Sequence, residues 1–240
     1  METWFWILGW FLSILTIAGN GFIIFLVCSK RQLRTKTNAF VVSLAVADFC
    51  VGMSVVPSMF ICEIATGCTP QLSWISSLRL LFSYASVMNL CNLVVDRYIA
   101  VVKPLKYLTF MKRRRVIQMV SSSWAIPLVH RIIFSLNWFI FKNPHYWDFL
   151  NWVTVIFFEF FPCFILIASF TFMLQVVCKH QRAVRTREKQ LRFNHQHASF
   201  KIQEKSAVKI MAVVIGLFLL CYGFYIRCSL VFIFKIGVLK

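Results

Sequence analysis

Six long apolar segments alternate with polar ones along the 240-residue chain. Each exceeds the roughly 20 apolar residues that a helix needs to cross a bilayer, so each is predicted to be a membrane-spanning helix. The predicted spans are residues 4–28, 38–62, 74–102, 116–136, 149–178 and 207–234. The pattern therefore predicts an all-α, polytopic helix bundle that forms a single transmembrane domain over residues 1–240, with no separate soluble domain.

Basic residues are concentrated between alternate spans. Segments 29–37, 103–115 and 179–206 are rich in Lys and Arg, whereas the segments after the second and fourth spans hold very few. By the positive-inside rule, the basic segments are cytoplasmic loops and the N-terminus is extracellular. Topology thus accounts for the net charge of +18, and we expect membrane lipids, not nucleic acid, as the partners of these loops.

Composition agrees with a membrane protein and argues against catalysis. The chain is 60% hydrophobic and 14% charged, whereas soluble domains are about 45–50% apolar and about 25% charged. No serine–histidine–aspartate or metal-ligand constellation is apparent, so no enzyme activity and no cofactor are expected. The scattered histidines are expected in loops and interfaces: His130, His145, His180, His195 and His197. A six-span transporter or channel is a remote alternative, because internal repeats and a regular arginine series are lacking.

The triplet Asp96-Arg97-Tyr98 lies at the cytoplasmic end of the third span, with Pro104 seven residues after the arginine. An acid–arginine pair is costly near lipid and usually has a function. The triplet and the proline together resemble the third-helix end and second inner loop of rhodopsin-like (class A) G-protein-coupled receptors. Further matches follow the order of that family, namely Gly19-Asn20, the run from Ser43 to Asp48, Trp124, Pro162 and the run from Phe218 to Cys221.

The resemblance implies a bundle of the seven-transmembrane receptor type, with six spans present, that senses an extracellular ligand and activates a heterotrimeric G protein. It implies that Glu204 ties the third span to the sixth, and the adjacent charges of Asp96 and Arg97 can form a local pair. The coupling and switch residues it implies are Asp96, Arg97, Tyr98, Pro104, Leu105 and Glu204. It implies a polar network able to hold sodium at Asn20, Asp48 and Ser86, and an activation core at Val87, Pro162, Phe218 and Tyr222.

The chain also departs from the family pattern. A seventh apolar span and its NPxxY motif are not seen, so a truncated, non-coupling receptor form and an incomplete gene product remain alternatives. We expect residence in the plasma membrane, or retention in the endoplasmic reticulum if the chain is truncated. Tyr222 and Phe224 replace a tryptophan and a proline, and Leu72 stands where the common outer disulfide has its cysteine. No disulfide is therefore expected.

The ligand is expected to differ from the family's commonest type. Arg79 occupies the position at which amine receptors carry an aspartate. A guanidinium repels an ammonium group and attracts a carboxylate or phosphate. We therefore expect a small-molecule, lipid or peptide ligand other than a biogenic amine. The candidate pocket consists of Arg79, Glu63, Glu159 and Arg227. Arg79 paired simply with Glu159 or Glu63 is the alternative, and receptor oligomers are left open.

Overall fold

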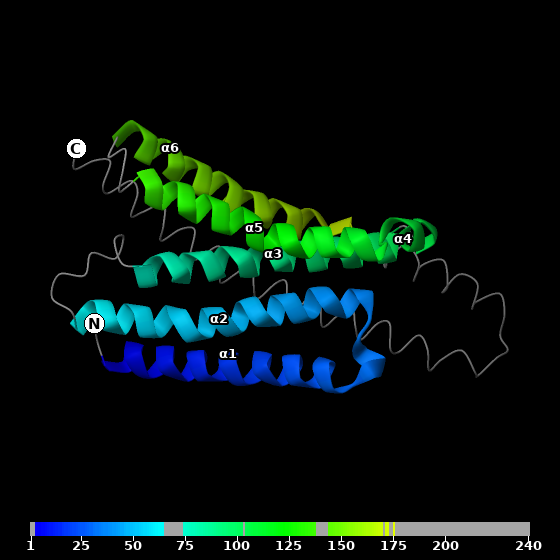
Figure 1. Cartoon of the computed structure of the whole chain (residues 1–240), viewed down its shortest axis with the longest axis horizontal. Helices are drawn as coiled ribbons and strands as arrows, with labels where there is room; N and C mark the ends of the chain where they lie inside the picture. The colour runs from blue at the N-terminus through cyan, green and yellow to red at the C-terminus, as the bar shows by residue number, and fades with distance from the viewer. Residues whose placement is uncertain are drawn as a thin grey trace. The chain divides into compact units, whose positions relative to one another are not determined.

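The computed structural model describes residues 3–64, 74–102, 104–137, 144–169, 171, 172 and 175. Every regular element in this part of the chain is a helix (Figure 1). The elements are α1 (Thr3–Ser29), η1 (Arg31–Leu33), α2 (Lys36–Ile64), α3 (Trp74–Val102), α4 (Pro104–Phe110), α5 (Arg113–Leu136), α6 (Pro144–Thr154) and η3 (Val155–Phe160). The all-α prediction is confirmed.

Five helical segments of the described residues are long and apolar enough to cross a membrane. They cover residues 6–29, 38–61, 77–100, 113–136 and 145–169, which correspond to the first five predicted spans. The sixth predicted span, residues 207–234, and the third cytoplasmic loop lie outside the described residues. Two details differ from the prediction. Part of the second basic loop forms the helix α4, and α5 begins at Arg113 rather than residue 116.

Residues 1–158 form one compact unit. In this unit α1 packs on α2, α2 on α3 and α3 on α5, and α2 also contacts α5 (Figure 1). Gly52 allows the close approach of α1 and α2, because a Cβ at this position would lie 2.9 Å from Cγ1 of Ile17 and 3.3 Å from the Ser13 carbonyl oxygen. The Ser13 hydroxyl also donates a hydrogen bond to the Gly52 carbonyl.

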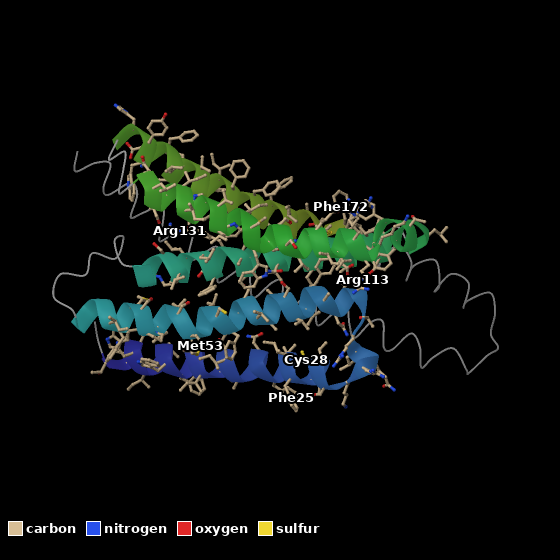
Figure 2. The ribbon with its side chains drawn as sticks, in the orientation of Figure 1. Phe25, Cys28, Met53, Arg113, Arg131 and Phe172 are labelled. Carbon is tan, nitrogen blue, oxygen red and sulfur yellow. The ribbon has the colours of Figure 1, made fainter. Side chains whose placement is uncertain are left out.

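Large apolar side chains cover the outside of the bundle, as expected of surfaces that face lipid. Phe25 on α1 is 67% exposed and points away from α2 (Figure 2). Polar side chains are found between the helices instead. The interior of the unit includes the polar residues Ser43, Asn89 and Ser123, and these side chains make hydrogen bonds between α2, α3 and α5.

Residues 159–240 form the second compact unit. Its described residues are all helical, and Pro162 and Leu166 are fully buried. The helix takes a wider, π-helical turn over Val155–Phe160, just before Pro162. Proline has no N–H to continue the regular hydrogen-bond ladder, which accounts for the irregular turn at this point.

Candidate functional site

The C-terminal end of α3 is joined to α4 through Asp96. The Asp96 side chain is 1% exposed, and the Tyr107 hydroxyl donates a hydrogen bond of 3.0 Å to its Oδ1. Asp96 Oδ2 is buried without a hydrogen-bond partner in the described part of the chain. Tyr107 is therefore the hydrogen-bond partner of Asp96 in the described part of the chain. The local ion pair of Asp96 with Arg97 stays a prediction.

The position of α4 follows from its sequence and from the residues beneath it. Pro104 opens the helix, where a missing N–H costs nothing. Tyr107 packs against a small buried cluster of Phe40, Met111 and Val116. Leu105 lies two residues before Tyr107, about 200° away around the helix, and is 92% exposed. The helix therefore turns one side toward α3 and presents a large apolar side chain on the other.

Asp48 and Ser86 meet between α2 and α3. The Ser86 hydroxyl donates a hydrogen bond to Asp48 Oδ1, so the structure brings together two of the three residues proposed for the polar network. The third, Asn20, donates to the Thr16 carbonyl of its own helix, at 3.0 Å. Carboxylate and hydroxyl oxygens are hard ligands of the kind that suit an alkali cation. Val87, the next residue on α3, is buried.

A three-helix junction lies in the N-terminal half of α2. The Ser43 hydroxyl donates to Asn89 Oδ1 at 2.7 Å and accepts from Trp124 Nε1 at 3.0 Å. Asn89 is fully buried and donates in turn to the Ala85 carbonyl at 2.8 Å. One small hydroxyl thus links α2, α3 and α5.

A second junction joins α3 to α5 through Asn92. Its amide nitrogen lies 2.8 Å from the Met119 carbonyl oxygen and 2.7 Å from the Ser123 hydroxyl. Ser123 is fully buried and itself donates to the Met119 carbonyl at 3.0 Å. The two asparagines of α3 therefore satisfy their polar groups on neighbouring helices or on their own backbone.

A polar and aromatic cluster lies toward the other end of α3 and α5. His130, expected in a loop or interface, is instead inside α5 and only 8% exposed. Its Nε2 lies 2.9 Å from the Thr154 hydroxyl, which donates to the Leu150 carbonyl. Because the Thr154 hydroxyl donates its proton to Leu150, its oxygen accepts a hydrogen bond from His130 Nε2. In the neutral ring with its proton on Nε2, Nδ1 is an acceptor. Its ring lies among those of Tyr84, Phe134 and Phe158.

The predicted ligand-pocket residues are only partly described. Arg79 is half-buried and its Nε has no hydrogen-bond partner among described residues. Glu159 is 5% exposed and its Oε2 is likewise without a hydrogen-bond partner there. The remaining residues and side chains lie outside the described part: Arg227, Glu204, Phe218, Tyr222 and the side chains of Glu63 and Pro104.

Comparison with known proteins settles the family. The family model described as "7 transmembrane receptor (rhodopsin family)" matches residues 19–238, nearly the whole chain. The chain belongs to this receptor family. The described residues supply five spans of a rhodopsin-type bundle. These spans are α1, α2, α3, α5 and the helical segment that begins with α6. The receptor is therefore a multi-pass membrane protein.

Relatives of this receptor carry names of amine receptors. It is 25% identical to mouse trace amine-associated receptor 5 over 87% of its own length and 65% of that protein. It is 31% identical to Caenorhabditis elegans dopamine receptor 4, over 57% of its own length and 27% of that protein. It is 35% identical to human 5-hydroxytryptamine receptor 2C, over 48% of its own length and 26% of that protein. The matched region thus spans between about a quarter and two thirds of these relatives' lengths.

Several contacts in the receptor were not anticipated from its sequence. Asn89 and Asn92 were overlooked, although two asparagines in an apolar span are a usable signal, since a polar side chain within a membrane needs a partner. No local pattern indicates the bond of Tyr107 to Asp96. The sequence also gives no sign that Arg131 is buried, at 7% exposure.

Proposed function

We propose that the chain is a G-protein-coupled receptor that senses an extracellular ligand and activates a heterotrimeric G protein through the face formed by the α3 end and α4. The plasma membrane, with an extracellular N-terminus, is its proposed location. Membership of the rhodopsin family supports the receptor function. The coupling face rests mainly on one observation, the 92% exposure of Leu105 on a helix that Tyr107 attaches to Asp96.

Helix α4 holds the apolar side chain of Leu105 exposed at a defined place. Leu105 gains free energy only when another apolar surface covers it, by about 1.5–3 kcal/mol for full burial. Tyr107 fixes its orientation relative to Asp96 and, through the α3 backbone, to Arg97. A partner that covers Leu105 therefore also contacts the cytoplasmic end of α3. A helix of a G protein that binds this face would make both contacts.

Substitution of Leu105 by alanine tests this proposal. The assay is basal and stimulated nucleotide exchange on a panel of Gα subunits, measured in membranes with matched receptor amounts. Ile117→Ala is the control, because Ile117 is also apolar and exposed, at 55%, but lies on the membrane-spanning α5. We expect a loss of exchange of about tenfold for Leu105→Ala and none for Ile117→Ala. Equal activities would contradict the proposed face, and no exchange with any Gα in the wild type would favour the non-coupling form.

The ligand is proposed to be anionic or neutral rather than a biogenic amine. The relatives named above are amine receptors by title, but this chain has Arg79 where such receptors carry an aspartate. Among described residues Arg79 Nε has no hydrogen-bond partner, and a buried donor of this kind favours an acceptor or a negative charge. Arg79→Asp is predicted to weaken the response to an anionic ligand, and an unchanged response would separate Arg79 from the ligand.

A further inference from the structure

Arg131 is a cation enclosed within a membrane-spanning helix. It lies five residues before the end of α5, within the span of residues 113–136, and is 7% exposed. Figure 2 labels it on the side of α5 that is turned toward α3. Charged side chains at such depth are rare, and they pair with other groups or serve a function.

The guanidinium of Arg131 is only partly satisfied. Its Nη2 donates to the Ser77 hydroxyl at 3.1 Å, and its Cζ lies 4.5 Å from the centre of the Phe134 ring. Its Nε is buried without a hydrogen-bond partner in the described part of the chain. The described acids of the same unit, Asp48, Asp96 and Asp148, make no ion pair with it. One hydroxyl and one ring leave the positive charge without a counter-charge from these residues.

An aromatic cluster continues from the guanidinium toward α6. Phe134, which contacts Arg131, also packs on Trp147 at 4.4 Å between ring centres and on His130 at 6.2 Å. The His130 ring lies 4.9 Å from that of Phe158. Phe134 and Trp147 are only partly buried, so their rings can pack against a further aromatic group. The unpartnered His130 Nδ1 provides an additional polar position beside these rings.

We propose that Arg131 and Ser77 form a carboxylate-binding site and that the adjoining rings receive the aromatic part of the same ligand. The ligand class is a small aromatic monocarboxylate. A guanidinium binds a carboxylate through two parallel N–H···O bonds, and the free Nε is one of the donors in this arrangement. The hydroxyl of Ser77 orients the fork, and Phe134 covers its face. The role of this ligand as an agonist rests on the receptor function proposed above, whereas its binding does not.

This site is distinct from the one expected at Arg79. Ser77 and Arg79 are two residues apart on α3, so their side chains project about 200° apart around the helix. Ser77 lies on the side that meets Arg131 on α5. Arg131 therefore contacts one side of α3, and the Arg79 side chain projects from another side. Substitutions at each position separate the two sites experimentally.

The test uses the purified full chain in lipid nanodiscs with 3-phenylpropionate as the probe. Phenethylamine, which has the same ring and linker but an ammonium group, is the matched control ligand. Binding is measured by saturation-transfer NMR and by the shift in thermal unfolding that a ligand of the folded state produces. We expect 3-phenylpropionate to bind and phenethylamine not to bind. Equal binding of the two, or no binding of the carboxylate, would overturn the proposal.

Three variants locate the bound carboxylate. Arg131→Gln should weaken binding by about tenfold or more, since a hydrogen-bonded charge is removed, and Ser77→Ala should weaken it less. Arg115→Gln is the control, because the Arg115 guanidinium also lies over a phenylalanine ring, that of Phe110, but at the other end of α5, and it should leave the affinity unchanged. Affinity that is lost in Arg79→Gln and kept in Arg131→Gln would refute the assignment. If Arg131→Gln does not fold, the affinities of Arg131→Lys and Ser77→Ala test the site instead. Lysine keeps the positive charge but lacks the planar fork of the guanidinium. Full affinity for 3-phenylpropionate in both variants would exclude the site.

The result also separates this site from receptor function. Carboxylate binding that depends on Arg131, without nucleotide exchange on any Gα subunit, would support the site and contradict coupling. Nucleotide exchange by a receptor that does not bind 3-phenylpropionate would support coupling and contradict the site.

Discussion

Ser43 offers the sharpest test of how the bundle is held together. Its hydroxyl makes two interhelical hydrogen bonds, to Asn89 on α3 at 2.7 Å and from Trp124 on α5 at 3.0 Å. Ser43→Ala removes both and leaves a buried amide oxygen and an indole N–H without these partners. Interhelical hydrogen bonds in membranes contribute about 0.6 kcal/mol on average and up to about 1.7 kcal/mol. The expected loss is therefore about 1–3 kcal/mol.

Ser122→Ala is the matched control. The Ser122 hydroxyl donates only within α5, to the Met119 carbonyl at 2.8 Å, so its loss breaks no contact between helices. We expect thermal unfolding in detergent to shift by about 2–12 °C for Ser43→Ala, using about 2–4 °C per kcal/mol for a chain of this size, and by less for Ser122→Ala. Equal shifts for the two variants would refute the argument that this junction holds the three helices.

A double-mutant cycle identifies the interaction directly. Trp124→Phe removes the indole N–H that Ser43 accepts, so its effect should not add to that of Ser43→Ala. The expected coupling energy is about 0.5–1.5 kcal/mol. Strictly additive losses would show that the two side chains contribute independently and that their hydrogen bond is without consequence.

Three further predictions concern packing, ions and the resting state. Gly52→Ala should destabilise the protein by about 1–3 kcal/mol, because the new Cβ would lie 2.9 Å from Ile17 Cγ1. Gly19→Ala is the control and should not destabilise it, because nothing lies within 4 Å of a Cβ at that position. The unfolding temperatures of the two variants are compared. Sodium should raise the unfolding temperature of the wild type relative to potassium at equal ionic strength, and Asp48→Asn should abolish that difference if the Asp48 carboxylate holds the ion. Glu204→Ala should raise basal nucleotide exchange, and an unchanged baseline would exclude the proposed tether to the arginine of the triplet.

The sequence indicated the first five apolar helices because membrane insertion depends on composition over about 20 residues. It did not predict α4. That helix has seven residues in a basic segment, and its stability comes from contacts of Tyr107 with Asp96 and the cluster around Phe40. Such contacts join residues far apart in the chain and leave no local pattern.

The candidate site shows the same division. The family resemblance implies that Asp48 and Ser86 belong to one polar network, and the structure forms a hydrogen bond between them. The bond of Asp96 to Tyr107 joins two different helices, and no local pattern indicates it. His130 was assigned to a loop or interface from its residue type, whereas its neighbours Thr154 and Phe158 come from another helical segment and bury it.

The central claim is that this chain activates a G protein through the cytoplasmic end of α3. The most direct measurement is nucleotide exchange on a panel of purified Gα subunits by the full chain in nanodiscs, compared between the wild type and Arg97→Ala at equal amounts of folded protein. The account predicts exchange above the receptor-free rate for the wild type with at least one Gα, and its loss in Arg97→Ala. Undiminished exchange in the variant, or none in the wild type, would contradict it.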